Sequence, residues 1–260
     1  MLRIITLNLN GIRSAAKKGF FNWLQDQNAD VVCVQEVKAQ EADLTDELFQ
    51  PKGYHRYFHF AEKKGYSGVG LYTRQKPIQT LTGLGWPEAD QEGRYVEVNL
   101  GKVTVASLYM PSGTSGEVRQ AVKFDFLQRF ANHLVQLRQR GNELIISGDW
   151  NIAHRQIDLK NWRGNQKNSG FLPEERAWMD ELFGAMNFVD AFRVMNEQEE
   201  QYTWWSNRGQ AWAKNVGWRI DYQVITSGLK DKIQAVSIYK DQRFSDHAPL
   251  IVDYAIDLEK

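Results

Sequence analysis

The stretch ELIISGDWNIAH (143–154) joins a strand-like run to a polar end. Because side chains alternate between the two faces of an extended chain, Asp149 and Asn151 are expected on one face and Trp150 on the other. A carboxylate and an amide side by side can hold a water molecule, a metal ion or a developing oxyanion. An Asx turn at the end of a strand would explain the same residues equally well. Other parts of the sequence are needed to distinguish a reactive edge from a simple turn.

Strand-like runs of this kind recur along the whole chain. They lie at 3–9, 30–36, 55–60, 68–74, 94–100, 102–110, 142–148, 221–227, 233–239 and 248–254, and helical patterns lie at 16–27, 121–140 and 173–186. The short gap between 94–100 and 102–110 indicates a hairpin and much antiparallel pairing. These elements predict two sheets packed face to face, with helices outside. No linker rich in Gly, Pro or Ser divides the chain, so one domain over 1–260 is expected.

The composition narrows the class of protein. With 260 residues and 42% hydrophobic side chains, the chain can bury a sizeable core. No apolar run approaches the roughly 18 residues that span a bilayer, and the N-terminus lacks a secretion signal, so we expect no membrane partner. The single cysteine, Cys33, is expected in the core of a cytoplasmic protein. The chain carries 32 basic and 32 acidic residues, which is unusual for a nucleic-acid-binding protein but compatible with a local basic face.

Polar residues stand at the ends of many of these strands. Each alone has an ordinary explanation, such as capping or turn chemistry, and a lone histidine is often a buried structural residue. In a two-layer sandwich, however, loops from different strands converge at one rim, where sites are usually built. Carboxylate and amide oxygens suit Mg²⁺ or Mn²⁺, and no Cys/His spacing in the sequence indicates zinc. The residues of this set are Asn8, Asn10, Glu36, Tyr109, Asp149, Asn151, Asp221, Asp246 and His247.

The motifs around these residues resemble a known family in content and order. They are LNLNGIR (7–13), QEVK (35–38), GYSGVGLYTR (65–74), DQEGRYVEV (90–98), LYMPSG (108–113), SGDWNIAHRQIDLKN (147–161), GNQKNSGF (164–171), NVGWRIDY (215–222) and SDHAPL (245–250). From about residue 3 to residue 254, the chain strongly resembles the exonuclease III family of apurinic/apyrimidinic endonucleases. The wider superfamily shares mainly the catalytic pieces, whereas GNQKNSGF and NVGWRIDY resemble the DNA-repair branch.

The resemblance implies a fold and an activity. The fold would be α/β, a four-layer α/β/β/α sandwich of two mixed, mostly antiparallel sheets with outer helices. The activity would be that of an Mg²⁺-dependent nuclease, with Mn²⁺ as a substitute, that hydrolyses the phosphodiester 5′ to abasic sites in duplex DNA. Secondary 3′–5′ exonuclease and 3′-end-cleaning activities would act on blocked 3′ ends. Such an enzyme is expected to be a monomer, associated with the nucleoid if it is bacterial.

The same resemblance implies a role for each polar residue. Asp149 would orient or deprotonate the attacking water, Asn151 would hold a phosphate oxygen, and Tyr109 would stabilise or protonate the leaving side. His247, oriented by Asp221, would contact the scissile phosphate. The implied metal ligands are Asn8, Asn10, Glu36, Asp149, Asn151 and Asp246, with Asn10 at a position where many relatives carry an aspartate. Asn8 would also buttress the site, and Asp246 could support the histidine instead of a metal.

An aromatic and basic segment, YTWWSNRGQAWAKNVGWRIDY (202–222), suits stacking on sugars and bases near phosphates. Core packing is the alternative explanation for some of its tryptophans. By the resemblance, Trp204, Trp218 and Ile220 would line a pocket for an extruded abasic sugar, which has no base to unstack. Ser169 at the pocket edge would leave room for that sugar, whereas a bulky residue would restrict the enzyme to 3′ ends. Further implied substrate contacts are Arg13, Tyr66, Asn165, Asn168 and Arg208.

Three alternatives to an abasic endonuclease stay open at this point. The protein could act mainly as a 3′–5′ exodeoxyribonuclease. It could be a phospholipid or inositol phosphodiesterase of the same superfamily, which would need neither the tryptophan pocket nor GNQKN (164–168). It could also be a non-catalytic DNA-binding module, for which the loss of Glu36, Asp149 or His247 would be typical; all three are present.

Overall fold

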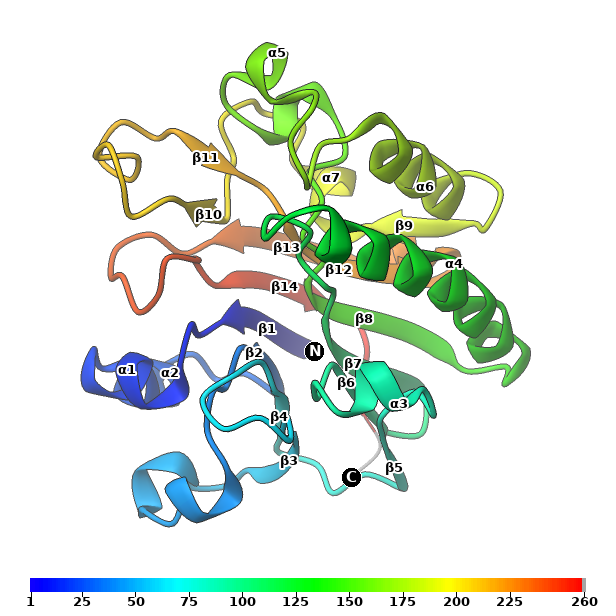
Figure 1. The fold of residues 1–260 in the computed structure, drawn as a ribbon. Helices are drawn as coiled ribbons and strands as arrows, with labels where there is room; N and C mark the ends of the chain where they lie inside the picture. The colour runs from blue at the N-terminus through cyan, green and yellow to red at the C-terminus, as the bar shows by residue number, and fades with distance from the viewer. Residues whose placement is uncertain (259–260) are drawn as a thin grey trace.

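The computed structural model describes residues 1–258, which form two six-stranded sheets packed face to face (Figure 1). The first sheet has the order β13–β14–β1–β2–β4–β3 and the second the order β5–β6–β7–β8–β12–β9. The first consists of β13 (Ile233–Ile238), β14 (Leu250–Tyr254), β1 (Leu2–Asn8), β2 (Val31–Gln35), β4 (Val69–Thr73) and β3 (His55–His59). The second consists of β5 (Gln79–Thr82), β6 (Tyr95–Asn99), β7 (Val103–Tyr109), β8 (Glu143–Asp149), β12 (Asp221–Thr226) and β9 (Phe188–Asp190).

A two-stranded ribbon and the helices complete the fold. The ribbon pairs β10 (Trp204–Trp205) with β11 (Gly217–Trp218). The α-helices are α1 (Ile12–Lys17), α2 (Phe20–Asp26), α3 (Pro87–Asp90), α4 (Glu117–Gln139), α5 (Trp162–Asn165), α6 (Pro173–Phe183) and α7 (Ala191–Met195). Short 3₁₀ turns lie at Glu41–Asp43, Glu47–Phe49, Gln156–Asp158 and Ser227–Lys232.

Parallel strand pairs decide where the polar strand ends meet. Within residues 1–258, β1 pairs with β2 and β7 pairs with β8 in parallel, and the other neighbours are antiparallel. Parallel neighbours end at the same edge of a sheet. Asn8 therefore lies beside the end of β2, which Glu36 follows, and Tyr109 pairs with Asp149. β12 begins at this edge, with Asp221 opposite Asp149. The topology brings the polar ends of both sheets to one rim.

Apolar layers hold the sandwich together, and strand alternation creates them. Ile4 on β1 and Ile145 on β8 point into the cluster between the two sheets. Their neighbours Ile5 and Ile146 point outward, toward α1 and α2 on one side and toward α4 and α6 on the other (Figure 1). This is the predicted four-layer α/β/β/α sandwich. The predicted burial of Cys33 is also confirmed, since it lies in the central cluster.

The ten long strands and three main helical regions predicted from the sequence are all present, within a few residues at their ends. The pattern at 16–27 is wrong as a single helix, because Gly19 has a left-handed φ of 88° and separates α1 from α2. The strands β5, β9, β10 and β11 were not predicted; they are short, and β5 is largely exposed, so it carries no apolar alternation.

The two sheets share one central apolar cluster, which supports the interpretation of the chain as one domain. Residues 259–260 of the predicted domain lie outside the described part of the chain. Within that part, the helices are too short or too polar to cross a membrane.

A buried ion network fixes the segment between β8 and β12 on the side of the second sheet. Asp158 is fully buried, and its Oδ1 accepts hydrogen bonds from Arg219 Nε at 2.9 Å and Arg193 Nη2 at 2.7 Å. Arg219 also donates from Nη2 to Asp190 at 2.7 Å. Burial acts to raise the pKa of Asp158, but Arg219 and Arg193 outweigh it and lower that pKa to about 2. The network therefore stabilises the start of β12, which carries the predicted site residue Asp221.

We predict that Asp158→Asn lowers the free energy of unfolding by about 3–5 kcal/mol, because it leaves the buried guanidinium groups of Arg193 and Arg219 with the Asp190 carboxylate alone. Urea unfolding at pH 7 measures the loss. The control is Asp125→Asn, which removes the carboxylate of an exposed ion pair with Arg129 and should cost less than about 1 kcal/mol. The Asp158 carboxylate stabilises the fold at pH values above its ordinary pKa of 3.8. This stabilisation is lost as the pH falls toward the folded-state pKa of about 2. Equal stability of both variants would contradict the role of the network.

Candidate active site

The centre of the site is a pair of carboxylates joined by one amide. Asn8, the last residue of β1, is fully buried, and its Nδ2 donates to Glu36 Oε1 at 2.8 Å and to Asp149 Oδ2 at 2.9 Å. Its Oδ1 accepts the backbone N–H of Asn10 at 3.0 Å. Because both ends of this amide are engaged, the geometry favours, of the two roles that the resemblance implied for Asn8, buttressing over metal ligation.

The same turn follows β1 and β8. The backbone N–H of Asn10 donates to Asn8 Oδ1, and that of Asn151 donates to Asp149 Oδ1 at 2.9 Å. Both following asparagines have left-handed backbones, with φ of 44° at Asn10 and 51° at Asn151, which asparagine tolerates better than most residues. Trp150 is fully buried on the opposite side, under α4 and α6. The two explanations of the opening stretch are therefore compatible, because the Asx turn positions the reactive edge.

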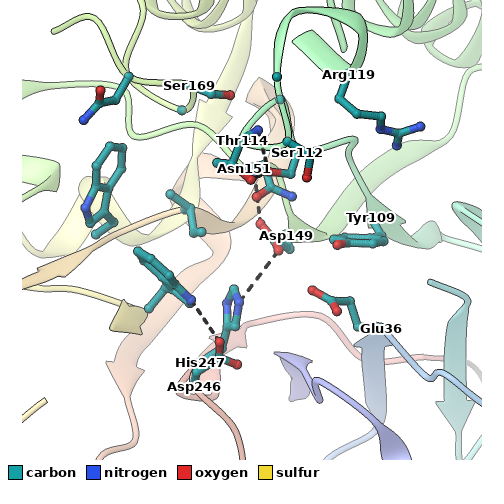
Figure 2. Close-up of a pocket in the computed structure, with 18 of the residues that line it drawn as sticks. Glu36, Tyr109, Ser112, Thr114, Arg119, Asp149, Asn151, Ser169, Asp246 and His247 are labelled. Carbon is teal, nitrogen blue, oxygen red and sulfur yellow. Dashed lines mark hydrogen bonds and ion pairs between the residues drawn. The ribbon is translucent and has the colours of Figure 1, made fainter. Parts of the chain in front are cut away.

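His247 lies between two buried carboxylates, of which Figure 2 shows that of Asp149. Its Nδ1 is 2.8 Å from Asp221 Oδ2, and its Nε2 is 3.9 Å from Asp149 Oδ2. Burial acts to lower the pKa of His247, but the charge and hydrogen bond of Asp221 outweigh it, and with Asp149 and Asp246 they raise that pKa to about 10. Burial and the charge of Asp221 raise the pKa of Asp149 to about 7. At neutral pH the imidazolium can donate a hydrogen bond, and Asp149 is suited to take up a proton.

Tyr109 lies at the end of β7, close to Glu36 and Asp149 in the same cleft (Figure 2). Arg94 holds it in place: Nη1 donates to the Tyr109 carbonyl at 2.9 Å, and the guanidinium carbon is 4.8 Å from the ring centroid. Burial raises the pKa of Tyr109 well above its usual value, and the charge of Glu36 adds to this, against the opposing charge of Arg94. The phenol is therefore protonated at neutral pH and can act as a hydrogen-bond donor.

Oxygen donors for a cation gather beside these groups. Ligand atoms of Glu36, Asp149 and His247 all lie within 4.8 Å of one another. A protonated His247 has no free lone pair, so the two carboxylates are the candidates for holding a cation. Glu36 Oε2 lies 2.6 Å from Lys38 Nζ, which also donates to Asn10 Oδ1 at 2.6 Å. The region formed by Glu36, Asp149 and Asn10, called the cation corner below, therefore accepts a positive charge. Its oxygen donors fit a hard divalent cation.

Asp246 connects the same corner to the aromatic residues. Its Oδ1 accepts from Asn10 Nδ2 at 3.0 Å, and its Oδ2 accepts from Trp204 Nε1 at 3.2 Å. Trp204 pairs with Trp218 across the β10–β11 ribbon, and their ring centroids are 6.4 Å apart at an angle of 78°. One carboxylate thus joins the aromatic pair to Asn10 at the edge of the cation corner.

These side chains lie in one open cleft of about 680 Å³ (Figure 2). Its lining contains most residues that the sequence assigned to chemistry or to substrate: Glu36, Tyr66, Tyr109, Asp149, Asn151, Asn168, Ser169, Trp204, Trp218, Ile220, Asp246 and His247. Asn151 Nδ2 donates one of its two hydrogens to the Met110 carbonyl at 2.8 Å, which leaves the other for a ligand. The structure therefore brings the groups that were predicted to act on phosphate and an aromatic wall into the same cavity.

Three predicted substrate contacts lie away from this lining. Asn165 instead accepts a hydrogen bond from Asn168 Nδ2 at 2.8 Å, so it supports a lining residue. Arg208 lies on the exposed loop between β10 and β11. Arg13 lines a separate hollow together with Lys17 and Lys38. Contact of these three side chains with substrate stays a prediction.

Sequence reasoning missed several residues of the site. Arg119 and Arg94 line the cleft, and both pair with Glu92, at distances of 2.9 and 2.6 Å. Lys38, in the quoted motif QEVK, was not assigned to the cation corner that it occupies. Lys123 lies within a helical pattern and was not recognised as buried. A basic residue at a core-facing position of an otherwise apolar helical stripe is the local signal that could have identified Lys123.

Comparisons with known proteins agree with this geometry. The model of the endonuclease/exonuclease/phosphatase family matches residues 5–247. The chain is 38% identical over 251 residues to an exodeoxyribonuclease of Bacillus subtilis (strain 168), covering 96% of this chain and 98% of that protein. It is 35% identical over 258 residues to the DNA repair nuclease APEX1 of Danio rerio, covering 98% and 83%. An AP endonuclease structure from Archaeoglobus fulgidus matches with a TM-score of 0.89 at 25% identity, covering 98% and 100%. The resemblance inferred from the motifs is confirmed, and this chain belongs to the endonuclease/exonuclease/phosphatase family.

Proposed function

We propose that this protein is a metal-dependent DNA repair nuclease that hydrolyses the phosphodiester 5′ to abasic sites in duplex DNA, with 3′–5′ exonuclease and 3′-end-cleaning activities. The observation that carries the proposal is a single cleft that combines Asp149 and His247 with the Trp204–Trp218 pair. Groups suited to phosphodiester hydrolysis thus lie beside a wall suited to a base-free sugar. The names of the curated relatives, an exodeoxyribonuclease and a DNA repair nuclease, support this activity.

The proposed chemistry follows from the charges of the cleft. Asp149 accepts the proton of the water that attacks phosphorus, since its raised pKa makes it a competent base near neutral pH. Negative charge then grows on the phosphate oxygens, and His247 Nε2–H, the Tyr109 phenol and the Asn151 amide donate to them. The Tyr109 phenol, which is protonated at neutral pH, is also our candidate for protonating the leaving oxygen. Because turns and buried pairs hold these donors before substrate arrives, they stabilise the transition state more than the ground state.

Glu36 and Asp149, with Asp246 and Asn10 beside them, would hold the cation, and we propose Mg²⁺, with Mn²⁺ as a substitute. A cation at this position supplies neutralisation of phosphate charge and a lower pKa for nearby water. Asn10 contributes no negative charge. Apart from Asp149, which also serves as the base, Glu36 is therefore the main anionic ligand for the cation. The salt bridge between Lys38 and Glu36 is the interaction that a bound cation would compete with.

The aromatic wall suggests the substrate class. An abasic nucleotide leaves the helix at low cost because it has no base to unpair or unstack. Ser169 lines the cleft near Gly113, and its hydroxyl lies 2.6 Å from where a Cβ on Gly113 would stand, so space at this edge is limited. We propose that the small size of Ser169 admits the flipped sugar. We also propose that the enzyme works inside the cell on genomic DNA as a monomer, since one chain supplies the whole catalytic set.

A second candidate is an enzyme that acts mainly as a 3′–5′ exodeoxyribonuclease, which the name of the Bacillus subtilis relative favours. A phospholipid or inositol phosphodiesterase would have no use for the paired tryptophans of β10 and β11. A non-catalytic DNA-binding module would have no use for a base and an imidazolium aimed into one cleft. Relative rates on matched DNA substrates separate the first two candidates.

The function is tested by Mg²⁺-dependent nicking of a duplex oligonucleotide that contains one tetrahydrofuran abasic analogue. We expect the wild-type protein to nick it, and Asp149→Asn to lower turnover by about 10²–10⁴-fold because the base is lost. DNA affinity, measured in Ca²⁺ or EDTA, should stay equal or increase in that variant, because a negative charge near phosphate is removed. A loss of affinity in proportion to turnover would assign Asp149 to structure instead of catalysis. No nicking by the wild type would refute the proposed function.

Metal dependence gives a second prediction. Glu36→Gln should keep the fold but raise the Mg²⁺ concentration for half-maximal nicking by about tenfold or more, because an anionic ligand is removed. Titration of Mg²⁺ at fixed DNA concentration measures the shift. Glu41→Gln is the matched control, since Glu41 pairs with Arg56 outside the cleft. Asn10→Asp should lower the half-maximal concentration. An unshifted Glu36→Gln titration would exclude Glu36 as a ligand.

The role of Ser169 gives a third prediction. Ser169→His should depress incision at an internal abasic site by at least about tenfold more than removal of a 3′-phosphate, because a terminal phosphate needs no sugar in the pocket. Both rates are measured on duplexes of matched sequence. Ser169→Gly is the control and should keep both activities. Equal losses in the histidine variant, or no loss, would rule out a pocket-edge role.

A further inference from the structure

The mechanism above makes no use of a buried cation on α4. Lys123 is fully buried, although the other buried positions of this helix are mostly apolar, such as Phe126 and Phe130. A lysine is rarely buried without a partner, because desolvation of its charge is costly. Its contacts therefore indicate what the helix holds in place.

The ammonium of Lys123 has two partners near the cleft. It donates to the backbone carbonyl of Asn151 at 2.8 Å and lies 2.6 Å from Glu175 Oε1. Glu175, in the first turn of α6, is also fully buried. Two helices that are distant in sequence thus meet at the residue whose amide faces the cleft.

The second oxygen of Glu175 reaches the wall of the cleft. Oε2 accepts the N–H of Gly170 at 2.7 Å and that of Leu172 at 3.0 Å. The carbonyl of Gly170 in turn accepts the N–H of Ala153 at 2.8 Å. The contacts form a closed circuit from Asn151 through Lys123, Glu175 and Gly170 to Ala153, two residues further along the same loop.

Gly170 has little room to move within this circuit. Its φ is 92°, and a Cβ at this position would lie 3.1 Å from the Asn151 carbonyl oxygen and 3.2 Å from the Trp218 ring. Ser169, its neighbour, lines the same cleft. A displacement of Gly170 would therefore change the spacing between the phosphate-directed amide and the wall of the proposed sugar pocket.

We propose that Lys123 and Glu175 form a positioning pair that fixes the spacing between Asn151 and the cleft wall at Ser169–Gly170, and thereby favours internal abasic sites over 3′ ends. The inference rests on the proposed function. An internal lesion needs phosphate and sugar to be held together, whereas a terminal 3′-phosphate uses the phosphate-directed groups alone. Loss of the spacing affects the first substrate more than the second.

The test separates position from stability. Lys123→Met leaves a buried carboxylate alone, whereas Lys123→Met/Glu175→Met removes both charges, so the double variant should melt at the higher temperature. The ratio of kcat/KM for the internal tetrahydrofuran site to that for the 3′-phosphate should nevertheless stay about tenfold below wild type in both. Lys123→Arg, which keeps the charge and the hydrogen-bond donors, should give a ratio within about threefold of the wild-type value. All rates are measured at a temperature at which every variant is folded.

Leu137→Ala is the control for general destabilisation. It removes a buried side chain from the same helix, away from the circuit, and should lower the melting temperature but leave the ratio unchanged. A wild-type ratio in the double variant, or a reduced ratio in Leu137→Ala, would overturn the proposal.

Amide exchange gives a readout that does not depend on activity. Ala153 N–H bonds to Gly170, not to either substituted residue, and should exchange faster in the double variant than in wild type. Unchanged Ala153 exchange would overturn the positioning circuit even if the wild-type protein incises abasic sites. Failure of the wild type to incise, with faster Ala153 exchange in the variant, would overturn the proposed function and the substrate preference but keep the circuit.

Discussion

The rim that carries the proposed catalytic residues depends on the two hydrogen bonds that Asn8 donates to Glu36 and Asp149. Glu36 follows β2 in one sheet and Asp149 ends β8 in the other, so one side-chain amide joins the two sheets where the site lies. Two carboxylates this close in a buried place repel each other, and a donor between them reduces the cost. The left-handed backbones at Asn10 and Asn151 follow from the turns that this arrangement requires.

Burial and the charge of Asp221 together set the protonation states of Asp149 and His247. Removal from water favours the neutral form of any ionisable group, which raises the pKa of Asp149 and would lower that of His247. Asp221 reverses the effect at the histidine, because its carboxylate bonds Nδ1 directly. The same carboxylate raises the pKa of Asp149 by repulsion. One buried acid thus helps to create both a base and a cationic donor, which is how a single cleft can offer acid and base roles at one pH.

Much of this could be predicted from the sequence, because strand alternation and polar strand ends are local properties. The run 143–149 and the turn after it were readable in this way, as were the polar strand ends of the cleft lining, such as Glu36 and His247. The tryptophans of the cleft wall and Ser169 were assigned from the family resemblance instead. Pairing between distant charges was not. Lys123 looks like an interruption of an apolar helical stripe until Glu175 is found beside it, and Arg119 pairs with Glu92 from another segment, so only the folded chain places those acids. The break at Gly19 likewise depends on a backbone angle that no apolar pattern encodes.

The balanced charge of the chain, 32 basic against 32 acidic residues, can now be reconciled with a DNA substrate. Lys123 and Glu175 enter that sum although both are fully buried, and a pair in contact produces little field outside the protein. The acids of the rim face a cation corner, where a divalent ion would offset them. Arg13, Lys17 and Lys38 line a separate hollow that adjoins this corner through Lys38. Attraction of a phosphate backbone depends on such local cations, so the net charge of the whole chain is a poor guide to the partner.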